Sequence, residues 1–130
     1  MDINIVLNKV INIANDYYQK NKSKFSLVQE SGYLETHEVI TENLILQGLK
    51  EQPEHITEWI AWSEDQRVSE GWFLKIDNNR FFVVDFSTKG GYKETLHKYL
   101  TIEAACAAFI KRQIEFSRKL WLSENEKKKK

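Results

Sequence analysis

Apolar residues recur at three- and four-residue steps over residues 3–21, which predicts an amphipathic helix at the start of the chain. The apolar positions of this helix are Ile3, Val6, Leu7, Val10, Ile13, Ala14, Tyr17 and Tyr18. Residues 25–35 fit either a short strand or one helical turn. A second helix is expected to run to about Lys50, with Thr36 or Thr41 as its N-cap.

A third helix is predicted to begin near Pro53, since proline suits the first helical turn, where its missing N–H is not needed. With about 100° between successive residues, one face of this helix carries Ile56, Trp59 and Ile60. The opposite face carries Glu54, Glu58, Ala61 and Asp65, and Trp62 lies at its edge. We therefore expect an apolar face that packs against the protein and an acidic face that meets solvent.

The clearest local pattern is a pair of β-rich segments, residues 72–76 and 81–86, on either side of a polar turn. Asn78 and Asn79 tolerate positive φ, so they predict a two-residue type I′ turn. The resulting register pairs Ile76 with Phe81, Leu74 with Val83, and Phe73 with Val84. One face then shows Trp72, Leu74, Ile76, Phe81 and Val83, and the other shows Phe73, Phe82, Val84 and Phe86. Because both faces are apolar, we expect the hairpin to be covered on both sides or to offer one side as a binding surface.

The chain is predicted to end in a helix that opens at Thr101, a residue type that caps helix N-termini well. Its inner stripe is Ala105, Cys106, Phe109, Ile110, Gln113 and Ile114, and residues 95–99 add a weak third strand before it. The predicted fold class is α+β, with N-terminal helices, a central antiparallel β-hairpin or small sheet, and a C-terminal helix packed on it. We expect a single domain over residues 1–122 and a disordered Lys-rich tail over residues 123–130.

The composition and the start of the chain indicate a cellular compartment. The chain has 130 residues, of which 42% are hydrophobic, and its single cysteine, Cys106, excludes an internal disulfide framework. The start of the chain lacks the basic and continuous apolar segments of a signal peptide. No window approaches the roughly 20 apolar residues of a membrane span. These features favour a cytoplasmic protein.

The formal net charge is zero, but the charges are unevenly distributed. Residues 29–70 contain ten Asp and Glu residues against two cations, Lys50 and Arg67. The run Lys127–Lys130 supplies four positive charges, so the rest of the chain is net negative. This balance disfavours nucleic acid as the partner, and no membrane partner is expected either.

The sequence offers no pattern for catalysis or cofactor binding. His37, His55 and His97 are isolated and lack metal-ligand spacing, and Gly90-Gly91-Tyr92 lacks the Lys-Ser/Thr and the helix of a phosphate loop. We therefore expect no enzyme, no metal and no cofactor. A hydrolase that uses His97 or Cys106 remains an alternative, although Cys106 falls on the inner stripe of a helix, where a thiol is inert.

The acidic side of the third predicted helix is the candidate binding site. Glu54 and Glu58 lie four residues apart on it, where like charges repel by roughly a few tenths of a kcal/mol, so folding gains nothing from them. Trp62 borders the carboxylates as an aromatic anchor with an electrostatic rim, whereas Trp59 and Trp72 are expected in the core. The candidate site is Glu54, Glu58, Trp62, Glu64, Asp65 and Glu70, and a merely solvated acidic surface is the alternative.

Two stretches of the sequence resemble a known kind of protein. The first is Ile56-Thr-Glu-Trp59-Ile-Ala-Trp62-Ser-Glu-Asp-Gln-Arg67 with the following Gly71-Trp72-Phe73, and the second is Thr101-Ile-Glu-Ala-Ala-Cys106-Ala-Ala-Phe109-Ile110. Over residues 54–114 they resemble the small immunity proteins of bacterial polymorphic-toxin and contact-dependent growth-inhibition systems. The resemblance implies a cytoplasmic antidote that binds a cognate toxin domain, often a nuclease, and blocks its active site.

We therefore expect an immunity protein, a monomeric toxin inhibitor that acts by protein–protein interaction on a basic toxin, in particular a nuclease domain. The alternative is a non-catalytic adaptor or small-ligand-binding module. Such a module would use the hairpin face of Phe73, Phe82, Val84 and Phe86 as a pocket wall.

Overall fold

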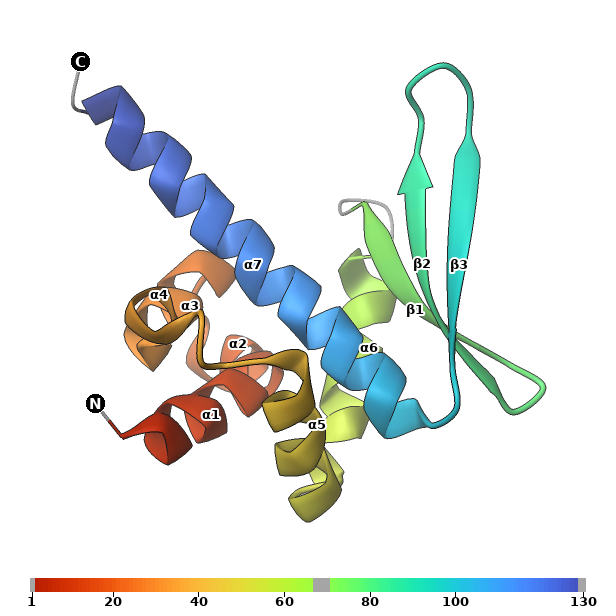
Figure 1. The fold of residues 1–130 in the computed structure, drawn as a ribbon, viewed down its shortest axis with the longest axis horizontal. Helices are drawn as coiled ribbons and strands as arrows, with labels where there is room; N and C mark the ends of the chain where they lie inside the picture. Colours follow the sequence, from red (N-terminus) through yellow and green to blue (C-terminus); the bar gives the residue numbers. More distant parts are fainter. Residues whose placement is uncertain (1, 67–70, 129–130) are drawn as a thin grey trace.

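The chain folds into a group of helices, a three-stranded antiparallel sheet and a long final helix (Figure 1). The computed structural model describes residues 2–66 and 71–128. The first helices are α1 (Ile3–Ile11), α2 (Ile13–Lys20), α3 (Lys24–Ser31), α4 (Tyr33–Thr36), α5 (Glu42–Glu51) and α6 (Glu54–Gln66). They precede β1 (Trp72–Asp77), β2 (Arg80–Ser87), β3 (Lys93–Tyr99) and α7 (Ile102–Lys128). The predicted α+β class is therefore confirmed.

The predicted N-terminal helix is two helices, because the chain breaks at Asn12. The side-chain amide of Asn12 donates to the carbonyl oxygen of Asn8 at 2.8 Å and shares this acceptor with the backbone N–H of Asn12 at 3.1 Å. The break lets α1 pack against α5 while α2 packs against α6. The approach of α5 to α1 is close, since a Cβ at Gly48 would lie 2.3 Å from Cδ1 of Ile11. Glycine at position 48 therefore serves the packing of these two helices.

The ambiguous segment at residues 25–35 is helical. Ser23 caps α3 through its side chain, and Gly32, with φ of 89°, turns the chain between α3 and α4. Of the two N-cap candidates for the next helix, Thr41 is the cap, because its Oγ1 accepts from the backbone N–H of Leu44 at 3.2 Å.

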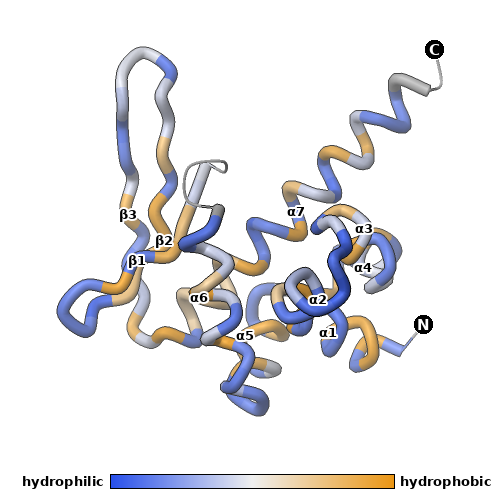
Figure 2. Tube along the Cα trace, turned by 180° about the vertical axis from the view of Figure 1, so that it is seen from behind, coloured by the Kyte–Doolittle hydropathy of each residue, from blue (hydrophilic) through white to orange (hydrophobic). Residues whose placement is uncertain are grey.

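The predicted hairpin and its register are confirmed. β1 pairs with β2 so that Phe73 faces Val84, Leu74 faces Val83 and Ile76 faces Phe81. Asn78 and Asn79 have φ of 49° and 62°, the positive values that a type I′ turn requires. This turn is hydrophilic, in contrast to the strands on either side of it (Figure 2). β3 has seven residues and begins two residues before the predicted third strand.

The two faces of the sheet have different surroundings. The inner face, which carries Leu74 and Val83, belongs to the main core with α6 and α7. The helices lie to this side of the sheet in both views (Figures 1 and 2). On the outer face, Phe73 and Val84 are 4% and 0% exposed, the ring of Phe73 contacts that of Phe86, and Phe82 is half-buried. The centre of the outer face is therefore filled, although no described helix covers it.

α7 is the long helix that passes both the other helices and the sheet. Thr101 caps it, accepting from the backbone N–H of Ala104 at 3.1 Å. The predicted inner stripe is confirmed, since Ala105, Cys106, Phe109, Ile110, Gln113 and Ile114 are all buried. The expected disordered tail is instead helical as far as Lys128, and this end of α7 projects from the molecule (Figure 1). The Glu and Lys residues of this segment are good helix formers, which favours its continuation.

No helix within residues 2–66 and 71–128 combines the length and the apolar character needed to cross a membrane.

Candidate functional site

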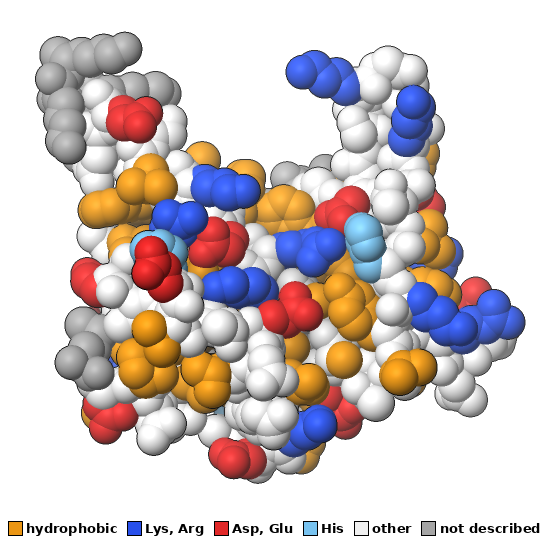
Figure 3. Space-filling view, viewed as in Figure 1, with side chains coloured by type: hydrophobic (Ala, Val, Ile, Leu, Met, Phe, Trp, Pro, Cys, Tyr) orange, Lys and Arg blue, Asp and Glu red, His pale blue; other side chains and the backbone are white. Residues whose placement is uncertain are grey.

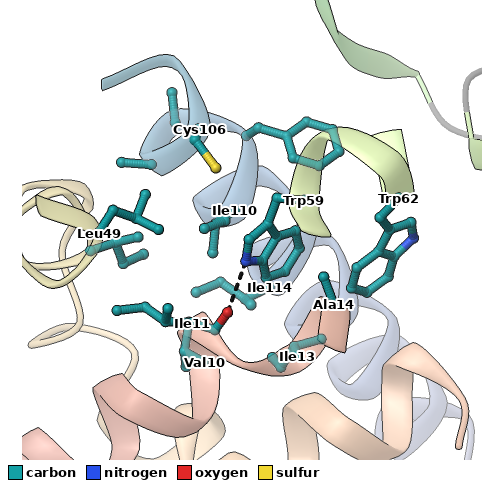
Figure 4. Close-up of a cluster of buried hydrophobic side chains, with 14 of the residues drawn as sticks. Val10, Ile11, Ile13, Ala14, Leu49, Trp59, Trp62, Cys106, Ile110 and Ile114 are labelled. Atoms are coloured by element: carbon teal, nitrogen blue, oxygen red, sulfur yellow. Dashed lines mark hydrogen bonds between the residues drawn. The ribbon is translucent and has the colours of Figure 1, made fainter. Parts of the chain in front are cut away.

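The candidate site depends on α6, which buries one side and exposes the other. Ile56 is 7% exposed and Trp59 is 0% exposed. The indole N–H of Trp59 donates to the carbonyl oxygen of Ile11 at 2.8 Å (Figure 4). A buried tryptophan removes on the order of 200 Å² of surface from water, so these contacts fix the rotation of α6 about its axis. The rotation in turn determines which side chains of α6 meet solvent.

The predicted exposure of Trp62 is wrong. Its side chain is 0% exposed, and its ring stacks on Trp59 at 4.9 Å and on Tyr17 at 5.2 Å between centroids, with an interplanar angle of 11° in both contacts. α2 packs against α6 at this flank, so the buried side of α6 is wider than the single-helix pattern predicts. Trp62 is a core residue and does not anchor a partner from the surface.

The acidic residues of α6 remain at the surface. Glu54, Glu64 and Asp65 are exposed, and Glu58 is half-buried with its carboxylate against Nδ1 of His55. We call Glu54, Glu58, Glu64 and Asp65 the acidic face. α6 contains no Lys or Arg. Among the described residues, no Lys or Arg lies within ion-pairing distance of the three exposed carboxylates. Of the predicted site, Glu70 lies outside the described residues.

The sequence pattern predicts that Trp62 is the exposed aromatic residue beside the carboxylates. In the structure, two tyrosines of α2 occupy that position. Tyr17 and Tyr18 are 38% and 47% exposed. Tyr17 stacks on Trp62, and the hydroxyl of Tyr18 donates to Oδ2 of Asp65. Burial and the Asp65 carboxylate raise the pKa of Tyr18 to about 12, so this hydroxyl keeps its proton at neutral pH. The acidic face is thereby joined to an aromatic pair at its C-terminal end.

Sequence reasoning missed these tyrosines because it placed both on the inward side of one long helix. Adjacent helical residues point about 100° apart, so Tyr17 and Tyr18 cannot both face the core of a helix that is half-exposed. Their adjacency is the available signal. The break at Asn12, which sets the direction of α2, then decides where they point.

A second polar cluster, which the sequence did not reveal, joins the sheet to α7. The guanidinium of Arg112 donates to both oxygens of Asp85, from Nε at 3.2 Å and from Nη2 at 3.0 Å. Nε2 of His97 lies 2.7 Å from Oδ2 of the same carboxylate. Burial opposes ionisation of Asp85, but the hydrogen bonds and charges of Arg112 and His97 outweigh it and lower the pKa of Asp85. The three side chains tie β2, β3 and α7 together.

The structure argues against Cys106 as a nucleophile. Its side chain is 0% exposed, and burial raises the pKa of the thiol, so neither access nor ionisation favours reaction. In the part of the chain that the structure describes, no three His, Cys, Asp or Glu side chains are grouped to hold a metal ion.

A surface pocket of about 210 Å³ lies between the first three helices. Its charged lining is Lys9, Asp16, Lys20, Lys22 and Glu30. Two of the lysines are paired with acids, at 2.7 Å for Lys22–Glu30 and 3.7 Å for Lys20–Asp16. The hydrogen bond from Lys22 is the main cause that lowers the pKa of Glu30, and the charges of Lys20 and Lys9 add to it. The pocket therefore has a small positive excess.

No protein-family model matches this chain, and no curated protein or solved structure matches it significantly.

Proposed function

We propose that this protein is an immunity protein that binds and neutralises a cognate bacterial toxin domain, in particular a basic nuclease domain. The observation that carries the proposal is the acidic face of α6, whose exposed carboxylates Glu54, Glu64 and Asp65 have no cation beside them among the described residues. Such a surface costs repulsion within the monomer, and a basic partner removes that cost.

The arrangement of the acidic face is suited to binding a partner whose own site binds phosphates. From Glu54 to Asp65 the helix rises by about 17 Å, so Glu54, Glu58 and Asp65 form a row of negative charges along α6, and Glu64 lies about 100° around the helix from Asp65. A row of this kind attracts the cations of a nucleic-acid-binding surface and blocks access to it. Because the attraction acts at a distance, the association rate is expected to be high and to fall as salt is added.

Tyr17 and Tyr18 complement the carboxylates. A tyrosine contributes a large contact area with few rotatable bonds, which makes it a frequent anchor in protein interfaces. The ring of Tyr17 stacks on Trp62, and the hydroxyl of Tyr18 donates to Asp65, so both side chains are held in place before a partner binds. Held side chains lose little entropy on binding.

The likeness to small immunity proteins supports the same function. It covers residues 54–114, which span α6, the hairpin, β3 and the first half of α7. The acidic face lies within this segment, and the tyrosines of α2 lie outside it.

The first experiment identifies the partner. The tagged full-length chain serves as bait in a lysate of its source organism, with washes at low and high salt, and bound proteins are identified by mass spectrometry. A basic C-terminal fragment of a large secreted or surface protein, released by high salt, is the expected result. Such a fragment must also arrest growth when expressed alone and fail to do so when this chain is co-expressed.

The second experiment tests the surface with the recovered fragment. The double variant Glu54→Lys/Glu64→Lys is expected to bind it about 100-fold more weakly by calorimetry, since close charge pairs in interfaces contribute about 1.5 kcal/mol or more each. The matched control is Glu126→Lys, which reverses a charge on the projecting end of α7 (Figure 1) and is expected to bind as the wild type does. Unchanged affinity of the double variant would exclude the acidic face as the interface.

A second candidate function, a small-ligand-binding module, is favoured by one observation, the lysine-lined pocket between the first three helices. Its positive excess suits a small phosphorylated or carboxylated metabolite. Thermal-shift screening with such metabolites tests it, and a rise in melting temperature that Lys9→Ala and Lys22→Ala abolish would favour this function. A screen without any stabilising compound would leave the immunity proposal as the stronger one.

A further inference from the structure

β3 is an edge strand with exposed apolar side chains on or beside it. The sheet order is β1-β2-β3, so only one side of β3 is paired within the described chain. Three of the most exposed large hydrophobic residues lie on it or directly beside it, with Tyr92 61%, Leu96 47% and Leu100 93% exposed. An edge strand of seven residues with unpaired backbone groups is a template for another strand. Proteins usually shorten or cover such an edge when it has no partner.

The outward residues of β3 follow a regular pattern. Glu94, Leu96 and Lys98 face the same side of the sheet, because they pair with Phe86, Val84 and Phe82 of β2. Tyr92 belongs to this side as well, since its ring contacts that of Phe86 at 6.2 Å between centroids. The hydroxyl of Tyr92 donates to the carboxylate of Glu94 at 2.6 Å. On this side of the sheet the pattern from residue 92 to residue 98 is therefore aromatic, acidic, apolar, basic, and the exposed Leu100 comes directly after the end of β3.

This pattern is complementary to its own reverse. When a second strand of the same sequence runs antiparallel and the two are centred on Leu96, the acidic position of each faces the basic position of the other. The two copies of the apolar residue Leu96 also meet at the centre. A contact between identical surfaces about a two-fold axis requires this property, whereas a contact with a foreign strand does not.

We propose that two copies of this chain pair through β3, antiparallel and centred on Leu96, to form one continuous six-stranded sheet. On the outer face the pairing places Glu94 of each copy opposite Lys98 of the other, which is a favourable cross-strand pair. On the inner face it places Thr95 opposite His97 and Lys93 opposite Tyr99, so no two like charges meet. The backbone groups of both free edges gain hydrogen-bond partners.

The surroundings of β3 leave room for this pairing. The β2–β3 hairpin projects from the body of the molecule as an arm, with Lys or Arg side chains near its tip (Figure 3). The side chains of β3 that the pairing uses are exposed, apart from the half-buried His97 and Tyr99. None of these residues belongs to the acidic face of α6, so the pairing is independent of the proposed toxin binding. It departs from the monomer that the sequence led us to expect.

The test is the mass of the full-length chain in solution, measured by sedimentation equilibrium over a range of concentrations. The wild type is expected to approach twice the 15.4 kDa of the single chain as concentration rises. Glu94→Lys alone and Lys98→Glu alone each place like charges opposite one another twice, and each is expected to raise the dissociation constant about tenfold or more.

The charge swap makes the test specific for this register. Glu94→Lys/Lys98→Glu restores both opposite pairs and is expected to restore the dimer. An equal mixture of the two single variants is expected to form a heterodimer that neither variant forms with itself at that concentration. Lys89→Glu, an exposed change in the loop between β2 and β3, is the matched control and leaves the dimer intact.

Three outcomes would overturn the proposal. These are a wild type that stays monomeric at every concentration, single variants that dimerise as the wild type does, and a double swap that does not recover association. Circular dichroism of each variant establishes that it is folded, which is expected because both residues are exposed. None of these measurements involves a toxin, so failure of the dimer and failure of the immunity proposal are distinguished.

Discussion

At the scale of single residues, Lys111 shows how a partly buried charge is accommodated. Its ammonium group donates to the hydroxyl of Tyr33 at 2.7 Å and to the carbonyl oxygens of Ile40 and His37 at 2.6 and 3.3 Å. The two carbonyl groups belong to the segment that links α4 to α5, so this side chain fastens that connection to α7. Burial lowers the pKa of Lys111, opposed by the nearby carboxylate of Glu115.

Replacement of Lys111 by methionine is expected to lower the free energy of unfolding by about 1–3 kcal/mol, because the carbonyl groups and the tyrosine lose a charged donor. Methionine keeps most of the aliphatic stem, so packing changes little. Urea denaturation measures the effect, with Lys119→Met as the control, since Lys119 is exposed on the same helix. Equal stability of the two variants would contradict the role of Lys111.

Trp62 provides a residue-scale test of the corrected site. Trp62→Ala is expected to cost about 3–5 kcal/mol of stability, because it removes a fully buried ring from between Trp59 and Tyr17. Chemical denaturation followed by far-ultraviolet circular dichroism measures this. A surface anchor would behave differently, losing partner affinity while stability changed by less than about 0.5 kcal/mol.

At the scale of elements, the hairpin was predictable because its signals are local. The Asn78–Asn79 turn fixes the register, and the register then fixes which residues share a face. The last helix was predictable for a similar reason, since its N-cap and its inner stripe are both defined by neighbouring residues in the sequence. Thr101 and the stripe that follows need no knowledge of the rest of the chain.

The turn gives a sharp element-scale prediction. Asn79→Val is expected to lower stability by about 1–2 kcal/mol, because a β-branched residue is strained at a φ of 62°. Asn79→Gly is expected to stay within about 0.5 kcal/mol of the wild type, since glycine adopts this backbone conformation freely. Thermal unfolding of the two variants side by side measures the difference. Equal loss in both would indicate that the side chain of Asn79, and not its backbone, is what matters.

The parts that the sequence did not predict depend on contacts between distant segments. Whether Trp62 is buried depends on α2, which packs beside it, and the direction of α2 depends on the break at Asn12. The same packing exposes Tyr17 and Tyr18. It also places Tyr18 beside Asp65, which lies 47 residues further along the chain. The pattern within α6 identifies its carboxylates, but it cannot identify the aromatic residues that another helix brings to them.

At the scale of the molecule, the Asp85 cluster joins the two layers of the fold. Asp85 lies on the middle strand, His97 on the edge strand and Arg112 on α7, so one carboxylate holds three elements. The inner face of the sheet packs on α6 and α7 through apolar contacts, which only weakly specify the orientation of the sheet relative to the helices. Charge-assisted hydrogen bonds specify this orientation more strongly, because they require particular atoms to meet.

The cluster predicts a pH dependence of stability. The folded state lowers the pKa of Asp85 below its ordinary value, so its ionised form favours the folded state. That contribution is present above an ordinary carboxyl pKa of about 3.9 and is lost as pH falls through the folded value. Asp85→Asn is therefore expected to cost about 1 kcal/mol at pH 7, since the partly exposed cluster is screened by solvent.

Denaturation curves from pH 7 to pH 3 measure this dependence. The difference between wild type and Asp85→Asn is expected to shrink toward the acid end of the range. Asp77→Asn, an exposed change on β1, is the control and is expected to show no such trend. A difference that stays constant with pH would mean that the Asp85 charge does not contribute to the fold.

The stack of Tyr17, Trp62 and Trp59 has an optical consequence. Aromatic rings held 4.9 and 5.2 Å apart in nearly parallel planes couple their electronic transitions, which gives a circular dichroism band that separated rings lack. Tyr17 is the accessible end of this stack and neighbours Tyr18 on the candidate surface. A protein that docks on these tyrosines would perturb the band, whereas pairing through β3 would leave it unchanged. The chain thus carries an intrinsic spectroscopic reporter that distinguishes occupation of its two surfaces without a dye.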